Sequence, residues 1–382
     1  MNGKISFLKL SFNNVLYFLK MKKLFIVMLG ASAVVACTKS SVSYEPAGEI
    51  ALAPVNEINK TKTTVTDADF PVDQIMGVYA YYKSDCLDGS AASTFKDAST
   101  YLDNVQFKNN GTDWAGWKDG AAYPYYWPKN GSLVFAAYSP LKDAEDAPSV
   151  GSHSFKANGT AVGTDSFVNE TFTQSRLTDK TVDFMWSPVT AASHTSASNR
   201  VAMTFYHAMS WITFKAKFTK PEGMSTTTKE PVITIKSLVL ENVATRGKFE
   251  THVSAIEWTP DDTHKESISI FRGEQALTET SANVENTANG TLVIPQKIES
   301  DIVATIVYDQ HVPGTAKVQQ TATLHLNQCK VGNQPLSSWT YAKHYIYDIN
   351  FTFGTDDQIY ITPSVDKWTA EKVSTEGAVD HK

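Results

Sequence analysis

The sequence is poor in the residue patterns that zinc proteins carry. It has only three cysteines in 382 residues, and Cys86 and Cys329 show no C-x-x-C or His-rich spacing. Structural zinc is disfavoured, because such sites need closely spaced Cys and His ligands. A Cys86–Cys329 disulfide is one alternative for an exported protein. We expect instead that the two cysteines are separate, in different domains, and act as small buried hydrophobes.

Catalytic motifs are also missing. The nine histidines are dispersed without H-E-x-x-H, and there is no G-x-S-x-G elbow, P-loop or dinucleotide fingerprint. His207 lies among apolar, strand-like neighbours, which favours a structural histidine over a catalytic base. Acidic groups such as Asp261-Asp262 lack the spacing of calcium loops and are interpreted as solvated turns. We therefore expect no enzyme activity, no metal and no cofactor.

The charge pattern lacks a basic cluster. The formal net charge is -6, and removing residues 1–36, which hold five lysines and no acid, brings it to about -11. Phosphate backbones are bound by clustered Lys and Arg. The sequence therefore predicts no nucleic-acid partner.

The N-terminal region has the pattern of an export signal. Lys22 and Lys23 precede the uncharged apolar run Leu24–Val35, which is shorter than the roughly 20 residues of a membrane-spanning helix. The following VVAC resembles the lipobox of bacterial lipoproteins, which implies that Cys37 is diacylated, carries palmitate and becomes the first mature residue. The alternative is a plain secretory signal that happens to precede a cysteine. Met21 begins a complete signal, so residues 1–20 are interpreted as an over-extended start.

The mature chain has an all-β texture. Short runs rich in Val, Ile, Thr, Tyr and Phe alternate apolar and polar residues between Asn, Gly, Asp, Ser and Pro. The candidate strands are Ile75–Tyr82, Leu133–Tyr138, Val201–Phe205, Trp211–Phe218, Val232–Leu240, Gly290–Ile294, Ile302–Tyr308, Ala322–Leu326 and Tyr345–Phe353. Many short strands with frequent turns predict β-sandwiches.

The length and the polar passages predict two domains after the signal. We expect a signal peptide at 1–36, an N-terminal β-sandwich at 37–200 and a C-terminal one at 201–382. The passage Ser187–Arg200 is the expected interdomain crossing. A second polar passage, Lys220–Glu230, is interpreted as a long hairpin loop between two strong strands.

The aromatic segment YPYYWPKNGSLVFAAY, at 123–138, has two interpretations. Exposed rings stack well on sugars or proteins, because a flat ring covers a large area at little cost in rotamer entropy. The candidates for such a surface are Trp114, Trp117, Tyr123 and Tyr125. The interpretation we favour places Tyr126, Phe135 and Tyr138 in the core of the first sandwich.

The order of several segments resembles the fimbrillin family, the lipoprotein precursors of type V pilus subunits of Bacteroides-like bacteria. The segments are YYWPKNGSLVFAAYSP (125–140), VDFMWSPV (182–189), VAMTFYHAMSWITFKAKF (201–218), ITIKSLVLENVATRGKF (233–249), LVIPQ (292–296) and the closing YAKHYIYDINF…ITPSVDKW (341–368). The resemblance spans the mature chain and includes the lipobox. It implies two transthyretin-like β-sandwich domains in tandem and a lipid-anchored, surface-exposed place at the cell outer membrane, in a fimbrium. It also implies other pilus subunits as partners, a host or bacterial surface receptor, and a role in adhesion and biofilm formation.

The resemblance further implies assembly by donor-strand exchange. A protease cuts after a basic residue in an early loop, the first strand leaves, and a strand of another subunit fills the groove. Here the displaced segment would contain Glu49–Ile58, with Lys62 as the preferred cut site and Lys60 as the reserve, before the core resumes at Ile75. The family more often has arginine at the cut, which keeps an uncleaved anchor or tip role open.

The C-terminal tail is polar, so a donor strand would lie in Tyr345–Phe353 or Gln358–Ser364. The alternative function, from a different class, is a surface glycan-binding lipoprotein that uses the four candidate aromatic residues.

Overall fold

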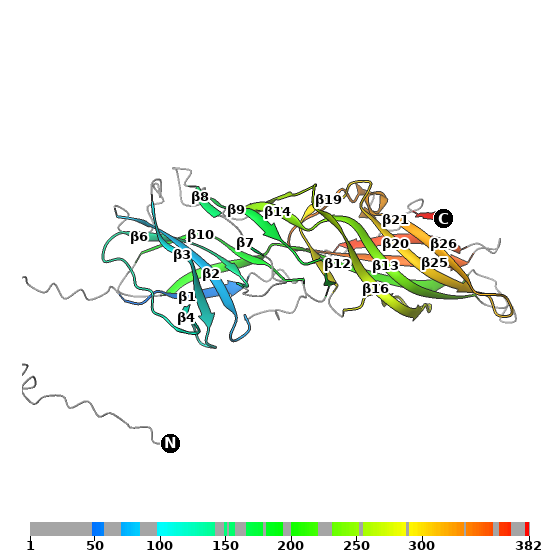
Figure 1. Cartoon of the computed structure of the whole chain (residues 1–382), viewed down its shortest axis with the longest axis horizontal. Helices are drawn as coiled ribbons and strands as arrows, with labels where there is room; N and C mark the ends of the chain where they lie inside the picture. The colour runs from blue at the N-terminus through cyan, green and yellow to red at the C-terminus, as the bar shows by residue number, and fades with distance from the viewer. Residues whose placement is uncertain are drawn as a thin grey trace, which may run out of the picture. The chain divides into compact units, whose positions relative to one another are not determined.

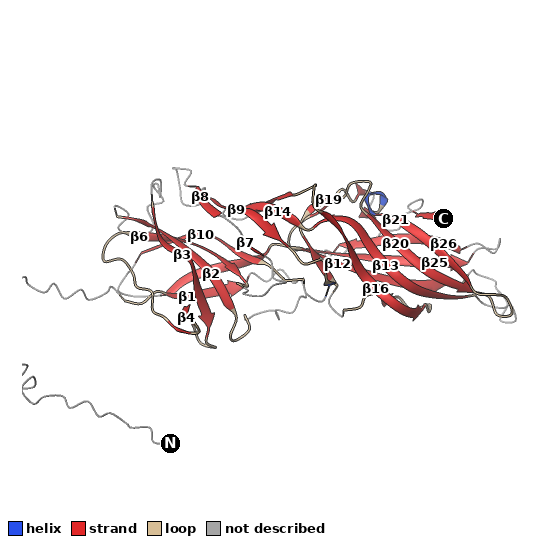
Figure 2. Ribbon diagram, viewed as in Figure 1, coloured by secondary structure: helices blue, strands red, loops and turns tan. Residues whose placement is uncertain are grey.

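The structure, a computed structural model, describes residues 48–56, 70–84, 98–141, 149–150, 153–156, 166–178, 181–193, 200–220, 231–251, 255–287, 290–331, 334–353, 359–367 and 379–381. All of these residues belong to one compact unit, Pro46–Lys382. The described residues form no α-helix; they include a short 3-10 turn, η3 (Leu326–Gln328), and are otherwise mostly strands (Figures 1 and 2). The all-β prediction is confirmed.

The first sheet has eight strands in the order β1-β11-β10-β6-β2-β3-β4-β5. Their bounds are β1 (Ala51–Asn56), β2 (Ile75–Lys83), β3 (Ser99–Asn109), β4 (Trp114–Lys118), β5 (Ala121–Ala122), β6 (Ser132–Ser139), β10 (Met185–Ser193) and β11 (Arg200–His207). Neighbouring strands are antiparallel except β1, which runs parallel to β11. A further pairing of Leu52 with Trp114 joins β1 to β4, so β1 closes the sheet on itself.

Two more sheets pack face to face. One has the order β17-β12-β25-β26 with β18 beside β12, and the other has the order β16-β13-β20-β21-β27. The bounds are β12 (Ser210–Thr219), β13 (Val232–Ala244), β16 (Lys265–Ala276), β17 (Ala282–Asn283), β18 (Thr291–Val293), β20 (Val303–His311), β21 (Val318–His325), β25 (Lys343–Phe353), β26 (Ile359–Lys367) and β27 (Val379–His381). Their inner faces form one hydrophobic core, in which the rings of Tyr308 and Phe351 meet edge to face at 5.2 Å. This pair of sheets is a β-sandwich.

Strand β25 shows why these sequences form strands. Tyr345, Tyr347, Ile349, Phe351 and Phe353 are buried, and the residues between them are only partly buried. Successive side chains of a strand point to opposite faces, so this alternation makes one apolar face. Burying that face against the facing sheet holds β25 in place.

The fourth sheet has the order β15-β14-β9-β7, with β8 beside β9. Its bounds are β7 (Ser149–Val150), β8 (His153–Lys156), β9 (Ser166–Thr173), β14 (Arg246–Thr251) and β15 (Ile256–Pro260). Two small ladders complete the fold: β19 (Gln296–Lys297) with β24 (Ser338–Trp339), and β22 (Lys330–Val331) with β23 (Gln334–Pro335). Phe172 and Phe249 of the fourth sheet share a hydrophobic cluster with Tyr138 and Trp186 of the eight-stranded sheet. The fourth sheet therefore packs on the eight-stranded sheet.

Two expectations about connections were wrong. Residues 187–193 of the expected crossing belong to β10, which pairs with β6, so this passage is part of a sheet. The strands on either side of the expected hairpin, β12 and β13, lie in different sheets. The change from the eight-stranded sheet to the next one falls between His207 and Ser210. The division of the mature chain into two tandem domains at residue 200 stays a prediction.

Candidate functional site

The segment expected to be displaced, Glu49–Ile58, contains β1. Before β1, the amide of Ile50 donates to the carbonyl of Tyr125 at 2.7 Å, and the amide of Trp127 donates to the carbonyl of Gly48 at 3.0 Å. The segment then crosses to β11 and pairs with it from Ala51 to Asn56. It is thus held by backbone hydrogen bonds along its described length.

The side chains of this segment are docked in the core of the eight-stranded sheet. Ile50 and Leu52 are fully buried, in one cluster with Trp114, Val201 and Phe205. Burying a side chain of this size contributes about 1.5–3 kcal/mol. If the segment left, β11 and β4 would each present an unpaired edge beside an apolar trench. We call this trench with its two edges the β1 groove.

The described chain resumes at Phe70, which lies in the β1 groove. The ring of Phe70 meets Trp114 at 5.3 Å and Phe205 at 5.2 Å, both edge to face. The Asn109 amide donates to the carbonyls of Phe70 and Pro71 at 2.8 and 3.1 Å. Phe70 is therefore fixed independently of β1. Lys60 and Lys62 lie outside the described residues.

A cavity of about 360 Å³ lies beside β1. Leu52 and Pro54 line it on one side, and Phe70 and Asn109 are among the residues on the other sides. Arg200, the first residue of β11, forms an ion pair with Asp113 at this cavity. Packing against β1 is incomplete here, which favours a strand that can be exchanged.

The two candidate donor strands differ in position. Strand β25 lies between β12 and β26, so both of its edges are paired. Strand β26 is the last strand in the order of its sheet. It pairs with β25 along its whole length, from Ile359 opposite Phe353 to Lys367 opposite Tyr345. Of the two, β26 would lose fewer backbone hydrogen bonds on leaving.

The four aromatic residues considered for a binding surface are not equally exposed. Trp114 is buried, Trp117 is half-buried beneath the Lys108 ammonium at 4.3 Å, and Tyr125 stacks on Phe107 at 5.6 Å. Tyr123 is 46% exposed. Of the four, Tyr123 has the most exposed ring, although the Lys118 ammonium lies over it at 5.2 Å and Tyr125 packs against it edge to face.

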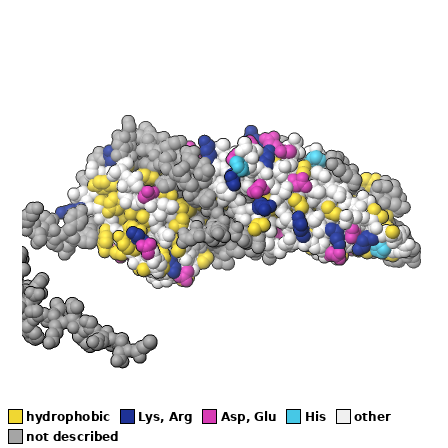
Figure 3. All heavy atoms as spheres, in the orientation of Figure 1, with side chains coloured by type: hydrophobic (Ala, Val, Ile, Leu, Met, Phe, Trp, Pro, Cys, Tyr) yellow, Lys and Arg dark blue, Asp and Glu magenta, His cyan; other side chains and the backbone are white. Residues whose placement is uncertain are grey.

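The favoured core interpretation is confirmed in part. Phe135 and Tyr138 are buried, but Tyr126 is 42% exposed, and its carbonyl accepts the Tyr101 hydroxyl at 2.6 Å. Tyr126 forms an antiparallel bridge with Glu49 of the β1 segment, and its side chain points away from the face that buries Trp127, because successive side chains alternate. Figure 3 shows hydrophobic side chains gathered on the surface of the eight-stranded sheet, whereas charges of both signs are scattered over the sandwich.

His207 is a structural residue in this geometry. It is buried at the end of β11, and its Nδ1 lies 2.9 Å from both carboxylate oxygens of the buried Asp183. Burial lowers the pKa of His207, but the charge and hydrogen bond of Asp183 outweigh burial and leave that pKa raised. The Asp183 carboxylate thus holds the His207 ring in place, which agrees with the structural role that the sequence predicted.

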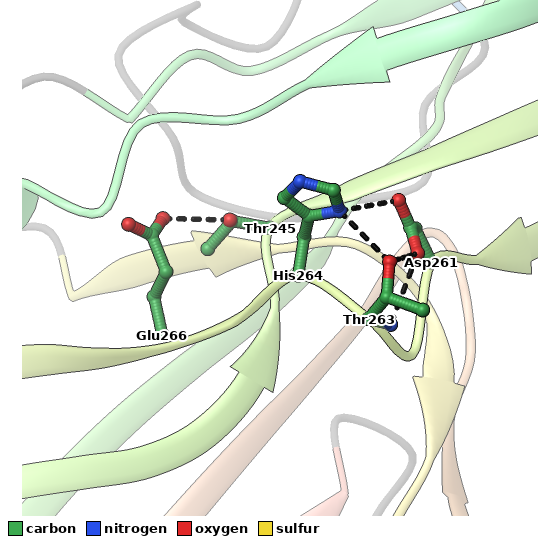
Figure 4. A network of polar contacts seen from close by, with 5 residues as sticks. All are labelled: Thr245, Asp261, Thr263, His264 and Glu266. Atoms are coloured by element: carbon green, nitrogen blue, oxygen red, sulfur yellow. Dashed lines mark hydrogen bonds and ion pairs between the residues drawn. The ribbon is translucent and has the colours of Figure 1, made fainter.

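A polar network occupies the turn between β15 and β16 (Figure 4). The Thr263 hydroxyl donates to Asp261 at 2.6 Å, and His264 Nδ1 lies 2.6 Å from the other Asp261 oxygen and 3.0 Å from Thr263 Oγ1. The hydrogen bonds from Thr263 and His264 hold the pKa of Asp261 below its usual value. Beside them the Thr245 hydroxyl donates to Glu266 at 2.7 Å.

This network does not have the geometry of a hydrolase triad. In a triad the nucleophile and the carboxylate meet different ring nitrogens, so that a proton passes through the ring. Here Asp261 and Thr263 meet the same nitrogen of His264. The network therefore fixes the turn and does not relay protons.

Cys329 is a free, buried cysteine, and burial raises the pKa of its thiol to about 12. Cys37 and Cys86 lie outside the described residues. No group of three or more metal-ligating side chains is found in the part of the chain that the structure describes. A search of the same residues found no helix that is long and apolar enough to cross a membrane.

Fold and groove together define an all-β protein whose N-terminal strand closes a sheet. The fimbrillin-like family model matches residues 63–368, and the chain belongs to this family. The family is a structural, fimbrial and adhesin type rather than an enzyme class, which supports a pilus-related role in adhesion. No curated protein sequence matches the chain.

Several solved structures are similar to it. A protein of Bacteroides uniformis ATCC 8492, provisionally named a cell adhesion protein, is 15% identical with a TM-score of 0.43, over 84% of this chain and 98% of that one. One of Bacteroides ovatus ATCC 8483, named in the same way, is 17% identical with a TM-score of 0.39, over 85% and 99%. The fimbrial anchor protein Mfa2 of Porphyromonas gingivalis is 11% identical with a TM-score of 0.29, over 86% and 99%.

Proposed function

We propose that this protein is a structural subunit or an accessory tip or anchor protein of a type V surface pilus. It is exported as a lipoprotein through Cys37, reaches the outer membrane and serves adhesion and biofilm formation. Assembly proceeds by donor-strand exchange at the β1 groove. The observation that carries the proposal is β1 itself, an N-terminal strand that closes a sheet and buries Ile50 and Leu52.

Strand exchange has a physical basis at this groove. Loss of β1 uncovers backbone donors and acceptors on β11 and β4 together with apolar side chains. An extended strand of another subunit restores both the hydrogen bonds and the apolar contacts by β-augmentation. The groove thus favours a second subunit over water.

The proposed cut follows Lys62, with Lys60 as the reserve. The family match begins at residue 63, directly after Lys62, and Phe70 anchors the chain that would remain. Both facts support a dispensable segment that ends at this loop. We propose β26 as the donor, because it lies at the edge of its sheet.

A reversible lock on β1 tests the mechanism. Ala53 and Ala202 are directly paired on β1 and β11, and neither is buried. Directly paired residues on neighbouring strands lie close enough for a disulfide. In a Cys86→Ser background, the pair Ala53→Cys and Ala202→Cys is expected to fold but not to polymerise after treatment with a lysine-specific protease. Reduction is expected to restore an SDS-resistant ladder on an unboiled gel.

The matched control is Ala53→Cys alone in the same background, which should form the ladder with or without a reductant. N-terminal sequencing of native protein from the cell surface should give a chain that begins at Thr63. A chain that still begins at acylated Cys37 and runs as a monomer would contradict the exchange mechanism and leave an uncleaved anchor. Ladder formation by the oxidised double variant would exclude the β1 groove as the site of exchange.

A further inference from the structure

A cavity of about 530 Å³ lies beside β15, away from β1. Its floor is apolar and comes from Ile256, Ile302 and Trp339, which are buried. Trp258 and Tyr341, both half-buried, stand among the lining residues. A volume of this size and a largely apolar lining with a few polar groups are typical of small-molecule sites.

The fold holds the Trp258 ring and the backbone beside Tyr341 in place. The Trp258 indole N–H donates to the carbonyl of Ala208 at 3.0 Å, and its ring packs on Phe172 at 5.0 Å and Phe249 at 5.1 Å. Next to Tyr341, the amide of Ala342 donates to the carbonyl of Met209 at 2.9 Å. Trp258 therefore presents a ring to the cavity that needs no ordering when a ligand binds.

Charged side chains of both signs surround the mouth. Asp262 and Glu299 carry negative charge, and Lys265 and Lys297 carry positive charge. Lys265 pairs with Asp301 at 3.1 Å, whereas Asp262, Glu299 and Lys297 form no ion pair or side-chain hydrogen bond with any residue that the structure describes. These three groups remain available as two acceptors and one donor.

The turn that carries Asp262 and Lys265 is the one fixed by the polar network of Figure 4. The amide of Thr263 also donates to Asp261 at 3.0 Å, and the amide of His264 donates to the Asp261 carbonyl at 3.0 Å. The network therefore holds the backbone on which these two residues approach the cavity. This gives the Asp261–His264 contacts a role in shaping the mouth.

We infer that this cavity binds a neutral oligosaccharide. A pyranose ring has an apolar face that stacks on an aromatic ring, and hydroxyls that donate to carboxylates and accept from an ammonium. The balanced charge at the mouth gives no net attraction for an anion. The site differs from the aromatic surface considered in the sequence analysis, and it does not rest on the proposed pilus assembly.

The test uses uncleaved protein, whose binding does not depend on strand exchange. Wild-type protein is first screened on an array of neutral and sialylated glycans, and the strongest neutral ligand is then titrated by isothermal calorimetry. Asp262→Asn and Glu299→Gln are each expected to raise the Kd about tenfold, because each removes a charged acceptor. Tyr341→Ala should also weaken binding, because Tyr341 lines the cavity.

Tyr123→Ala is the matched control, since it removes an exposed ring from the other surface, and it should leave the Kd unchanged. Circular dichroism and melting of each variant separate loss of binding from loss of fold. The inference is overturned if no neutral glycan binds, if the Asp262 and Glu299 variants bind like wild type, or if Tyr123→Ala abolishes binding. Tighter binding of 3′-sialyllactose than of lactose would show that the cavity prefers an anionic glycan and would overturn the assignment of a neutral ligand.

Discussion

His344 lies flat on Trp211, with ring centroids 3.5 Å apart and 11° between the planes. The two residues face each other across the parallel pair β12 and β25, and His344 Nε2 lies 2.8 Å from the Thr213 hydroxyl oxygen. Burial, and next the positive charge of Lys215, lower the pKa of His344 to about 4. The imidazole is therefore neutral in the folded protein at physiological pH.

This lowered pKa predicts a loss of stability in acid. An unfolded histidine takes up a proton near pH 6.5, whereas folded His344 does so only near pH 4. The unfolded state therefore binds more protons between these values, and the free energy of unfolding falls as the pH drops from 6.5 to 4. His344→Phe, which keeps a flat ring, should remove this contribution, so that its stability in urea titrations falls less than that of wild type as the pH drops from 6.5 to 4. An unchanged slope would contradict the pKa.

Glu285 predicts the opposite slope. It lies in the chain between β17 and β18, its Oε1 accepts the Phe214 amide at 2.8 Å, and the Gly290 amide also hydrogen-bonds to its carboxyl group. Burial raises the pKa of Glu285 from 4.5 to about 7. The folded state keeps the proton that the unfolded state loses above pH 4.5, so stability falls as the pH rises from 4.5 to 7.

Two variants separate the proton from the hydrogen bonds of Glu285. Glu285→Gln should remove this falling contribution while it keeps an acceptor oxygen, so that the opposite contribution of His344 between pH 4.5 and 6.5 is no longer offset. Glu285→Ala should lower the free energy of unfolding by about 1–3 kcal/mol at every pH, because two amides lose their acceptor. Denaturation of the three proteins at pH 5 and pH 8 measures both effects. Equal pH slopes for wild type and Glu285→Gln would rule out Glu285 as the titrating group.

Leu52→Ala should loosen β1 selectively. Leu52 is buried against the core of the eight-stranded sheet and pairs with Trp114, and removing a buried leucine typically costs about 2–5 kcal/mol. Since β1 is terminal, we expect local release, seen as faster hydrogen exchange in β1 and β11 with β13 and β20 unchanged. Leu102→Ala, in the same cluster but on β3, is the control and should not speed hydrogen exchange in β1 more than in the other strands. Equal exchange in β1 and β20 of the leucine variant would contradict local release.

Gly116→Ala tests the packing of the aromatic segment. A Cβ at this position would lie 2.1 Å from the carbonyl oxygen of Tyr123 and 2.6 Å from the Tyr125 ring. The added methyl must displace the backbone, which we expect to cost about 1–3 kcal/mol and to lower the melting temperature. Gly120→Ala is the comparison, because it is strained only by its φ of +82° and meets no atom within 4 Å. A smaller loss for Gly116 than for Gly120 would argue against this packing.

Strand positions were predictable where one face is buried. The predicted strand Ile75–Tyr82 lies within β2, and Tyr345–Phe353 lies within β25, because apolar alternation reports burial of one face directly. The passage SPVTAAS in β10 was missed because its small polar residues show no alternation, and its strand depends on pairing with β6. Whether a segment without alternation forms a strand therefore depends on the neighbouring strand with which it pairs.

The sites were less predictable than the strands. The core cluster around β1 was inferred from a family resemblance, but the closing pair Leu52–Trp114 joins residues that no local pattern connects. Trp258 and Tyr341 are distant in sequence and meet only through the sheets that bring β15 and β24 together. Glu285 belongs to no sequence motif either. It accepts the Phe214 amide because the pairing of β12 is interrupted between the short strands β17 and β18.

The parallel pairing of β1 with β11 also has a consequence for biosynthesis. Ala51 pairs with Arg200, so the first strand is made about 150 residues before its neighbour, a delay on the order of 10 s at ordinary rates of translation. During that time the eight-stranded sheet cannot be closed, and of the partners of β1 only those on the side of Trp114 and Tyr125 are present. The strand that we propose to leave during assembly is thus among the last to find its partner in the newborn chain.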